Sequence, residues 1–239
     1  MAPRARKALE RAEVIVGYDT YMGLLDPHLL QGKETIATGM RKEMERCRAA
    51  IDKAVEGRQT AVVSSGDAGI YGMAGLVLEL LDQRGLLGKV DVEIIPGIPA
   101  LAAAAALLGA PLMHDFAVVS LSDLLTPWEV IRSRIEAAAK ADYVIVLYNP
   151  RSRKRNWQLT RAKEILLACR SGSTPVGIVR SAMREGQWVE VTTLSGLDET
   201  HADMLSILVV GNSRTRVLGG RMVTPRGYLQ KYGSSVEGI

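Results

Sequence analysis

The feature that most constrains the fold of this chain is a glycine-rich turn over residues 64–75, with glycines at positions 66, 69, 72 and 75. A β-branched run at 60–63 precedes the turn, and an apolar pattern with helical spacing follows it. This order predicts a strand, a tight turn and a helix start, which together expose backbone N–H groups to a ligand. Asp67 adds a carboxylate at the strand's carboxyl end, where open α/β sheets bind ligands.

The spacing of these glycines argues against the common nucleotide-binding motifs. They lie three residues apart, which does not match G-x-G-x-x-G, and no Lys-Ser/Thr pair of a phosphate loop follows them. Two interpretations stay open from spacing alone. The turn either binds a ligand or uses its glycines only for close packing.

Apolar runs and amphipathic stretches alternate along the chain and predict an α/β protein. The predicted strands are 14–16, 60–64, 90–95, 116–121, 143–148, 175–179, 188–193, 206–210 and 216–223. The predicted helices are 5–12, 40–55, 76–83, 100–108, 127–135 and 159–169. We therefore predict two α/β domains, 1–113 with a mainly parallel sheet and 114–239 with a mixed sheet.

Four turns follow the carboxyl ends of predicted strands, at 65–72, 96–100, 120–127 and 147–155. In α/β proteins such turns line one crevice, and between two domains they would face each other across a ligand cleft. The sequence therefore predicts a small-molecule site built from these turns.

Composition narrows the class of ligand. The net charge of +4 fits an acidic small molecule but is too weak to indicate a nucleic acid. The longest apolar run, 100–108, is far shorter than a membrane span. Cys47 and Cys169 have no metal-ligand spacing and are interpreted as buried thiols of a reducing compartment. We expect a soluble cytoplasmic protein without a bound metal.

A basic cluster, Arg151, Arg153, Lys154 and Arg155, follows the strand that ends at Tyr148. Cations at a helix N-terminus oppose the helix dipole, so four of them favour a compensating anion. Arginine pairs well with carboxylates, which indicates a polycarboxylate or phosphate ligand. The alternative is a solvated helix start.

Covalent nucleophilic catalysis has little support, because the chain contains no G-x-S-x-G motif and no triad order. Asp123 and His114 are the candidate general acid and base. For each of them a structural role is the alternative.

Three motifs together carry a resemblance to a known family. They are Ser-Ser-Gly-Asp-Ala-Gly-Ile-Tyr-Gly-Met-Ala-Gly at 64–75, Pro-Gly-Ile-Pro-Ala at 96–100, and Leu-Tyr-Asn-Pro-Arg-Ser-Arg at 147–153 with Gln-Leu at 158–159. Weaker matches lie at 179–182 and 208–212. The chain resembles the tetrapyrrole methylases, the S-adenosylmethionine-dependent enzymes of the corrin and sirohaem pathways. It is most similar to their precorrin-3B C17-methyltransferase branch, which includes the cobalt-precorrin-3 counterparts.

This resemblance implies two α/β domains, S-adenosylmethionine bound between them, a homodimer, and methylation at C17 of a tetrapyrrole with ring contraction in cobalamin biosynthesis. It implies methyl-donor contacts at Ser65, Gly66, Asp67, Ile70, Pro99, Ala100, Asn149 and Ala182. The candidate substrate-binding residues are Tyr148, Arg151, Arg153 and Arg155, the arginines on the ground of their charge. Methyl transfer from a sulfonium depends mainly on positioning, which such a site would provide.

One difference from the family concerns the first strand. Family members usually begin with an apolar strand and a Gly-x-Gly-Pro-Gly loop, followed by a stretch similar to Met1–Leu9 of this chain. We therefore expect that strand and its loop to be missing from the first sheet.

Three other functions stay open. A methylase of another ring position or of a non-tetrapyrrole substrate is disfavoured by the Asn-Pro-Arg signature at 149–151. A truncated, non-catalytic tetrapyrrole-binding or assembly protein is a second alternative. A nicotinamide-dependent reductase is disfavoured by the glycine spacing.

Overall fold

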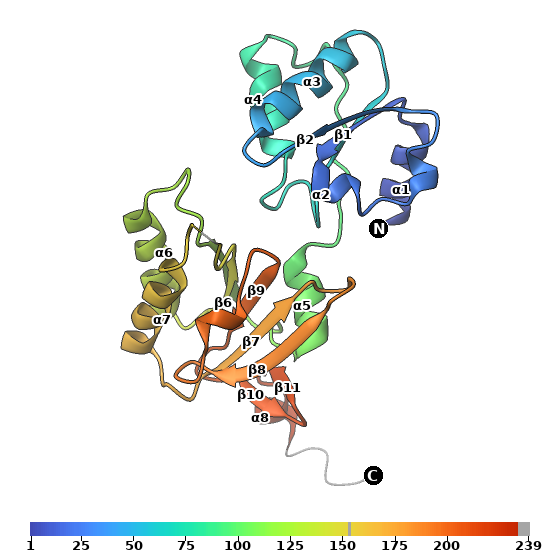
Figure 1. The fold of residues 1–239 in the computed structure, drawn as a ribbon. Coiled ribbons are helices and arrows are strands. Elements are labelled where there is room, and N and C mark those ends of the chain that lie inside the picture. The colour runs from blue at the N-terminus through green and yellow to red at the C-terminus, as the bar shows by residue number, and fades with distance from the viewer. Residues whose placement is uncertain (153, 234–239) are drawn as a thin grey trace, which may run out of the picture. The chain divides into compact units, whose positions relative to one another are not determined.

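The computed structural model describes residues 1–152 and 154–233. The chain divides into two compact units, Met1–Pro99 and Ala100–Ile239, whose elements are labelled in Figure 1. The sequence predicts a boundary after residue 113, whereas the contacts in the structure group residues 100–113 with the second unit. The two units are described separately below.

The first unit is built on a three-stranded parallel sheet with the strand order β2-β1-β3. The strands are β1 (Val14–Tyr18), β2 (Glu34–Thr38) and β3 (Thr60–Val63). The helices are α1 (Pro3–Arg11), α2 (Asp19–Met22), the 3₁₀ turn η1 (Pro27–Leu29), α3 (Glu43–Val55) and α4 (Ala74–Gln83).

Strand β1 is buried because helices cover both of its faces. On one face Ile15 packs in a cluster with Leu9 of α1, and on the other Val16 packs with Ala50 of α3. A strand covered on both faces reads as a continuous apolar run, which is why the pattern at 14–16 predicted it. Behind α3, Cys47 and Leu80 join helices α3 and α4.

Two details of the first unit differ from the sequence prediction. The strand predicted at 90–95 is wrong, since the described residues give this stretch only an isolated bridge between Leu87 and Val90. Its alternating pattern favours extended backbone, but a strand also needs a neighbour to pair with. The sequence pattern does not predict strand β2, because Glu34–Thr38 is short and mixed in polarity.

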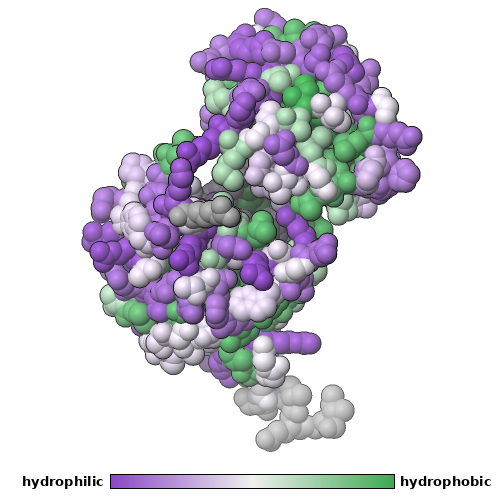
Figure 2. Space-filling model, viewed as in Figure 1, coloured by the Kyte–Doolittle hydropathy of each residue, from purple (hydrophilic) through white to green (hydrophobic). Residues whose placement is uncertain are grey.

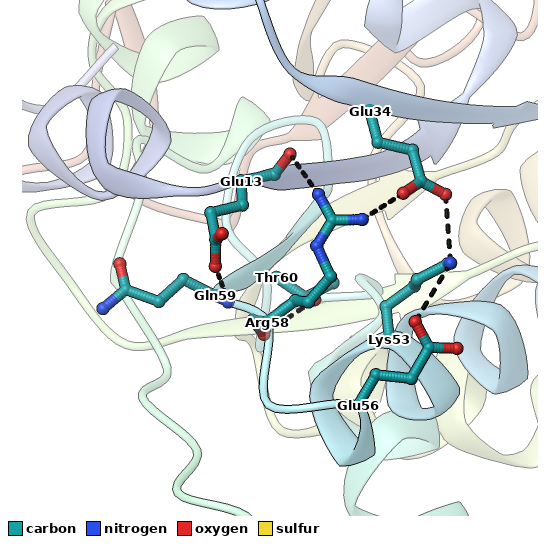
Figure 3. A network of polar contacts seen from close by, with 7 residues as sticks. All are labelled: Glu13, Glu34, Lys53, Glu56, Arg58, Gln59 and Thr60. Carbon is teal, nitrogen blue, oxygen red and sulfur yellow. Dashed lines mark hydrogen bonds and ion pairs between the residues drawn. The ribbon is translucent and has the colours of Figure 1, made fainter.

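Charged side chains connect the elements at the amino-terminal end of the first sheet (Figure 3). The Glu34 carboxylate pairs with the Arg58 guanidinium and lies 3.3 Å from the Lys53 ammonium. Arg58, mainly through its hydrogen bond, holds the pKa of Glu34 below its ordinary value. Glu13 Oε2 accepts a hydrogen bond of 2.9 Å from the Gln59 backbone, so this network joins all three strand starts.

The second unit contains a five-stranded mixed sheet with the order β5-β6-β9-β7-β8 and a small sheet with the order β10-β11-β4. The strands are β4 (Gly109–Ala110), β5 (Phe116–Ser120), β6 (Val144–Tyr148), β7 (Pro175–Arg180), β8 (Trp188–Thr193), β9 (Ser206–Val210), β10 (Arg216–Leu218) and β11 (Arg221–Val223). The helices are α5 (Ala100–Leu108), α6 (Trp128–Lys140), α7 (Gln158–Cys169), the 3₁₀ turn η2 (Glu199–His201) and α8 (Tyr228–Tyr232). The single strand predicted at 216–223 is therefore a hairpin.

Helices cover both faces of the five-stranded sheet, with α6 and α7 on one side and α5 on the other (Figure 1). Alternation along β6 separates the two cores. Ile145 and Leu147 belong to the cluster with α6 and α7, whereas Val144 and Val146 belong to the cluster with α5. A Cβ atom at position 177 would lie 2.4 Å from a Leu108 methyl group, so glycine there lets α5 pack close to the sheet.

The direction of the strands determines which loops share an edge. Strand β5 is parallel to β6, and β9 is antiparallel to both β6 and β7. The carboxyl ends of β5, β6 and β7 and the start of β9 therefore lie at one edge of the sheet. This architecture confirms the predicted α/β class, with a parallel first sheet and a mixed second sheet.

The surface shows hydrophobic residues scattered among hydrophilic ones over both units on the face seen in Figure 2. Within the described part of the chain, every helix is too short or too polar to traverse a lipid bilayer. The free cysteines are Cys47, which is buried, and Cys169, which is exposed rather than buried as predicted. Cys169 is the last residue of α7, where the helix leaves the core.

Candidate functional site

Strained backbone gathers at the carboxyl ends of the strands in both units. Five non-glycine residues with positive φ follow strand ends, namely Arg41 (66°), Tyr71 (53°), Asn149 (51°), Ser181 (49°) and Met183 (58°). Such conformations are costly for residues with a Cβ and are concentrated at functional sites. In the first unit they lie after β2 and β3, and in the second after β6 and β7.

The glycine-rich turn of the first unit is organised by its own side chains. Ser64 Oγ accepts a hydrogen bond of 3.1 Å from the Met73 backbone N–H, which closes the turn just before α4. Gly66 has a φ of 74°, which an L-residue rarely adopts. At Gly72, a Cβ atom would lie 2.4 Å from the Ala68 carbonyl oxygen, so the backbone there has no space for a side chain.

The Asp67 carboxylate joins this turn to the turn at 96–99. Its Oδ1 accepts from Gly69 N and its Oδ2 from Gly97 N, both at 2.8 Å. These two backbone hydrogen bonds, with Gly97 the larger contributor, lower the pKa of Asp67. Asp67 is therefore ionised at neutral pH and fixes two loops, in addition to any contact it makes with a ligand.

The remaining predicted donor contacts of the first unit flank Asp67. Ser65 and Gly66 precede it, Ile70 is exposed three residues later, and Pro99 ends the turn that contains Gly97. The structure thus places these predicted positions on two turns that Asp67 joins. A Cβ at position 97 would lie 1.8 Å from the Gly66 carbonyl oxygen, which shows how closely the two loops approach.

Arg46 is a residue of this edge that sequence reasoning missed. Its side chain is buried on α3, its Nε donates to Thr38 Oγ1 at 2.9 Å, and one Nη donates to Gly39 O at 3.1 Å. The guanidinium also lies 5.6 Å from the Tyr18 ring centroid. Arg46 therefore fixes the carboxyl ends of β1 and β2, a role visible only once β2 is known to end at Thr38.

In the second unit, Asn149 is held in its strained conformation from both sides. Its Nδ2 donates to Ser120 Oγ at 3.0 Å, which ties the end of β6 to the end of β5. Its carbonyl oxygen accepts a hydrogen bond from the Arg155 guanidinium, and Arg155 Nη2 lies 3.2 Å from the Met204 sulfur. Burial lowers the pKa of Arg155, while the charge of Asp123 opposes that effect.

Tyr148 connects the chain beside two predicted donor contacts, Ala100 at the start of α5 and Asn149 after β6. Its hydroxyl oxygen accepts a hydrogen bond of 3.0 Å from Leu101 N in the first turn of α5. Tyr148, Ala100 and Ala182 also pack against the same core cluster. The structure therefore places Ala100, Asn149 and Ala182 at one edge of the five-stranded sheet.

Arg151 lies beside a cavity of about 430 Å³. The cavity is lined by Arg151, Ser152, Asn156, Ala202, Asp203, Met204 and Leu205. One Nη of Arg151 donates to Glu199 O at 3.2 Å, and Asp203 Oδ1 accepts from Leu205 N and Ser206 Oγ, both at 2.8 Å. This arrangement provides a cation beside exposed apolar groups. The predicted contact at Arg153 lies outside the described residues.

The two predicted acid–base residues are far apart along β5. Asp123 follows the carboxyl end of the strand, where its Oδ2 accepts a hydrogen bond of 2.9 Å from Gln158 Nε2. His114 precedes the strand, and its Nδ1 accepts a hydrogen bond of 2.8 Å from the Asp115 backbone N–H. Only Asp123 is thus at the edge that holds Asn149 and Arg151. Among the residues that the structure describes, no cluster of three or more His, Cys, Asp or Glu is arranged to hold a metal ion.

The structure is thus a two-unit α/β protein in which left-handed backbone conformations follow the carboxyl ends of parallel strands. A family model, Tetrapyrrole (Corrin/Porphyrin) Methylases, matches residues 1–198. The chain therefore belongs to the tetrapyrrole methylase family.

Two relatives narrow the comparison within the family. The chain is 54% identical over 228 residues to a probable cobalt-factor III C(17)-methyltransferase of Salmonella typhimurium, covering 95% of this chain and 93% of the relative. It is 39% identical over 219 residues to a precorrin-3B C(17)-methyltransferase of a Sinorhizobium species, covering 91% of this chain and 85% of that relative.

Solved structures agree with this assignment of the fold. The crystal structure of the methyltransferase CobJ matches with a TM-score of 0.90 and 37% identity, over 94% of this chain and 93% of that chain. A uroporphyrin-III C-methyltransferase from Thermus thermophilus, complexed with S-adenosyl homocysteine, matches with a TM-score of 0.63 and 21% identity over 88% of this chain and 90% of that chain. The second likeness concerns the fold alone.

Proposed function

We propose that this protein is an S-adenosylmethionine-dependent C-methyltransferase that methylates C17 of precorrin-3B, or of its cobalt-containing counterpart, with ring contraction in cobalamin biosynthesis. The observation that carries the proposal is the similarity, over nearly the whole chain, to two C17-methyltransferases at 54% and 39% identity. The strained loops at the carboxyl ends of the strands support it, because they supply a site where a ligand is expected.

The residues of both edges fit a methyl donor. S-adenosylmethionine supplies an electrophilic methyl group on a sulfonium, and the ionised Asp67 carboxylate suits a ligand with cationic and hydroxyl groups. We propose donor contacts from Ser65, Gly66, Asp67, Ile70 and Pro99 of the first unit and from Ala100, Asn149 and Ala182 of the second. Their task is to bind and orient, since methyl transfer depends mainly on in-line positioning.

On the substrate side, we propose that Arg151 pairs with a carboxylate of the tetrapyrrole. Tyr148 and Arg155 act beside it. The Arg155 guanidinium is already engaged with Asn149 O and Met204, so its charge also holds the loop after β6 in place. The assignment of Arg153 as a further carboxylate contact rests on its sequence position alone.

Proton transfer during ring contraction is proposed for Asp123, with His114 as the second candidate. Asp123 is favoured because it lies at the edge that carries Asn149, whereas His114 lies at the start of β5. An Asp123→Asn variant that methylates normally would remove Asp123 from this role.

We also propose a homodimer located in the cytoplasm. The homodimer rests on the family resemblance and is tested by sedimentation equilibrium, where a monomer at micromolar concentration would contradict it. The cytoplasmic location is supported by two free cysteines, which fit a reducing compartment.

The proposed activity is tested by incubating the purified protein with methyl-labelled donor and, separately, precorrin-3B and cobalt-precorrin-3. Label in either tetrapyrrole product is expected. If folded protein transfers no label to either compound, the proposal is wrong. A panel of other tetrapyrroles in the same experiment tests the alternative of methylation at another ring position.

A non-catalytic tetrapyrrole-binding role is the second candidate function. Calorimetry with S-adenosylhomocysteine separates it from the enzyme, because a methyltransferase must bind the demethylated donor. Absence of that binding, with tetrapyrrole binding retained, would favour the non-catalytic role.

A further inference from the structure

Two adjacent leucines lie exposed in the loop over residues 121–127, between β5 and α6. Leu124 is 68% and Leu125 92% exposed to solvent. Burial of a leucine side chain is among the larger favourable contributions to folding or binding. Two neighbouring leucines in water form a small apolar surface that a bound ligand or partner would cover.

The base of this loop is anchored. Leu121 is buried, and its N–H donates a hydrogen bond of 2.9 Å to the Tyr148 carbonyl oxygen. The Asp123 carboxylate accepts from Gln158 of α7, and Trp128 at the start of α6 stacks edge-on against Trp157 with ring centroids 4.9 Å apart. The exposed leucines therefore lie in a loop that is fixed at both ends, between β5 and the first residue of α6.

The anchors of the loop are also the anchors of the proposed substrate edge. Ser120, directly before the loop, accepts from Asn149, and the charges of Asp123 and Arg155 interact. Arg151 follows Asn149 by two residues and provides a cation beside the cavity lined by Met204 and Leu205. Exposed apolar side chains and a cation at one edge match a ligand with a broad apolar ring and carboxylate arms.

We propose that Leu124 and Leu125 contact the apolar ring of the tetrapyrrole acid while Arg151 pairs with one of its carboxylates. The proposal rests on the proposed function. It adds the side chains that contact the tetrapyrrole ring itself, whereas the arginines contact its carboxylates. The leucines contribute to substrate affinity and not to donor binding, because no donor contact is assigned to their loop.

The experiment compares wild-type protein with the Leu124→Ser/Leu125→Ser variant. Binding of cobalt-precorrin-3 is measured by quenching of tryptophan fluorescence without donor, and binding of S-adenosylhomocysteine by calorimetry. The variant is expected to bind the tetrapyrrole about tenfold more weakly, with unchanged donor affinity and Tm. A matched control is Val217→Ser/Leu218→Ser, which alters adjacent residues of β10 that are 46% and 51% exposed.

Three outcomes of the comparison between the variants would overturn the inference. They are unchanged tetrapyrrole affinity in the leucine variant, an equal loss in the control, and a change of oligomeric state, which would make the leucines part of a protein interface. Wild-type protein that binds no tetrapyrrole overturns it as well. Wild-type protein that binds the tetrapyrrole but transfers no methyl group contradicts the proposed function alone, since the binding comparison still decides the role of the leucines.

Discussion

The two ends of the first sheet use opposite means to hold their loops. At the amino-terminal end, Glu34, Arg58 and Lys53 join the strand starts through exposed and half-exposed ion pairs. At the carboxyl-terminal end, Asp67 accepts only backbone N–H groups, and the chain adopts left-handed conformations at Gly66 and Tyr71. The first end is held mainly by ion pairs near the surface, whereas the second combines left-handed backbone with hydrogen bonds from Asp67 and the buried Arg46 to the main chain.

This difference indicates that function is expected at the carboxyl-terminal end of the sheet. Surface ion pairs contribute little each and tolerate substitution. Strained loops that the surrounding structure must hold in place carry a cost that a ligand site explains. Substitutions at the carboxyl-terminal end should therefore change binding, while those at the amino-terminal end should change only stability.

The largest effect is expected for Gly97→Ala. Its Cβ would lie 1.8 Å from the Gly66 carbonyl oxygen, so the turns at 64–75 and 96–99 must separate. We expect a loss of about 3 kcal/mol in the free energy of unfolding and loss of donor binding. Denaturant unfolding and calorimetry measure both.

Gly75→Ala is the matched control, because a Cβ at that position in α4 meets no atom within 4 Å. It should be neutral or stabilising by up to about 1 kcal/mol. Equal destabilisation by the two variants would contradict the claim that the close approach of Gly97 to Gly66 causes the loss.

Asp67→Asn is expected to weaken donor binding about tenfold, because an amide offers one acceptor oxygen where the carboxylate serves both Gly69 and Gly97. The pKa of Asp67 is lowered in the folded protein, so its contribution to stability is present above the ordinary value of 3.8 and lost as pH falls through the folded value. The stability difference between wild type and variant should therefore be constant at neutral pH and shrink in acid. Unchanged donor affinity would remove Asp67 from the site.

Arg151→Ala should weaken tetrapyrrole binding several-fold, since it removes one charge-assisted contact. The loss should be smaller at high salt, where the wild-type contact is itself screened. Fluorescence titration at two salt concentrations measures the effect, with calorimetry of the donor as the control. A defect confined to donor binding would contradict the carboxylate role.

The smallest effect is expected for Glu34→Gln at the amino-terminal end. Its lowered pKa means that the ion pairs stabilise the fold above the ordinary pKa of a glutamate and are lost as pH falls through the folded value. The variant should show a slightly lower Tm at pH 7 and unchanged donor and substrate affinity. If binding changed as much as in Asp67→Asn, the contrast between the two ends would be wrong.

Much of this fold could be predicted from local sequence signals. The apolar run at 14–16, the helix around Cys47 and the Ala-rich helix at 100–108 carry patterns that burial on one or two faces imposes. The stretch at 90–95 alternates apolar and acidic residues as a half-buried strand does, but no strand forms there, because pairing depends on a neighbouring strand that the pattern does not reveal. Strand β2 shows the reverse: it is short and half polar, so its pattern does not predict a strand, yet it pairs with β1.

The sequence predicts positions of the candidate site where a motif coincides with a strand end, as at Asp67 and Asn149, and their contact with a ligand stays a prediction. The roles of the side chains were less predictable. The charge of Arg155 predicts a substrate contact, yet its guanidinium is engaged with the carbonyl oxygen of Asn149, six residues earlier in the chain. Arg46 and the exposed pair Leu124–Leu125 carry no motif, because their importance comes from contacts and exposure that only the folded chain defines.

The central claim is tested most directly by following the methyl group itself. The protein is incubated with donor carrying a ¹³C-labelled methyl group and with precorrin-3B or cobalt-precorrin-3, and the product is examined by NMR. The account predicts one new labelled methyl resonance on C17 of a ring-contracted product. Label at another carbon, or no label from protein that binds S-adenosylhomocysteine, would contradict it.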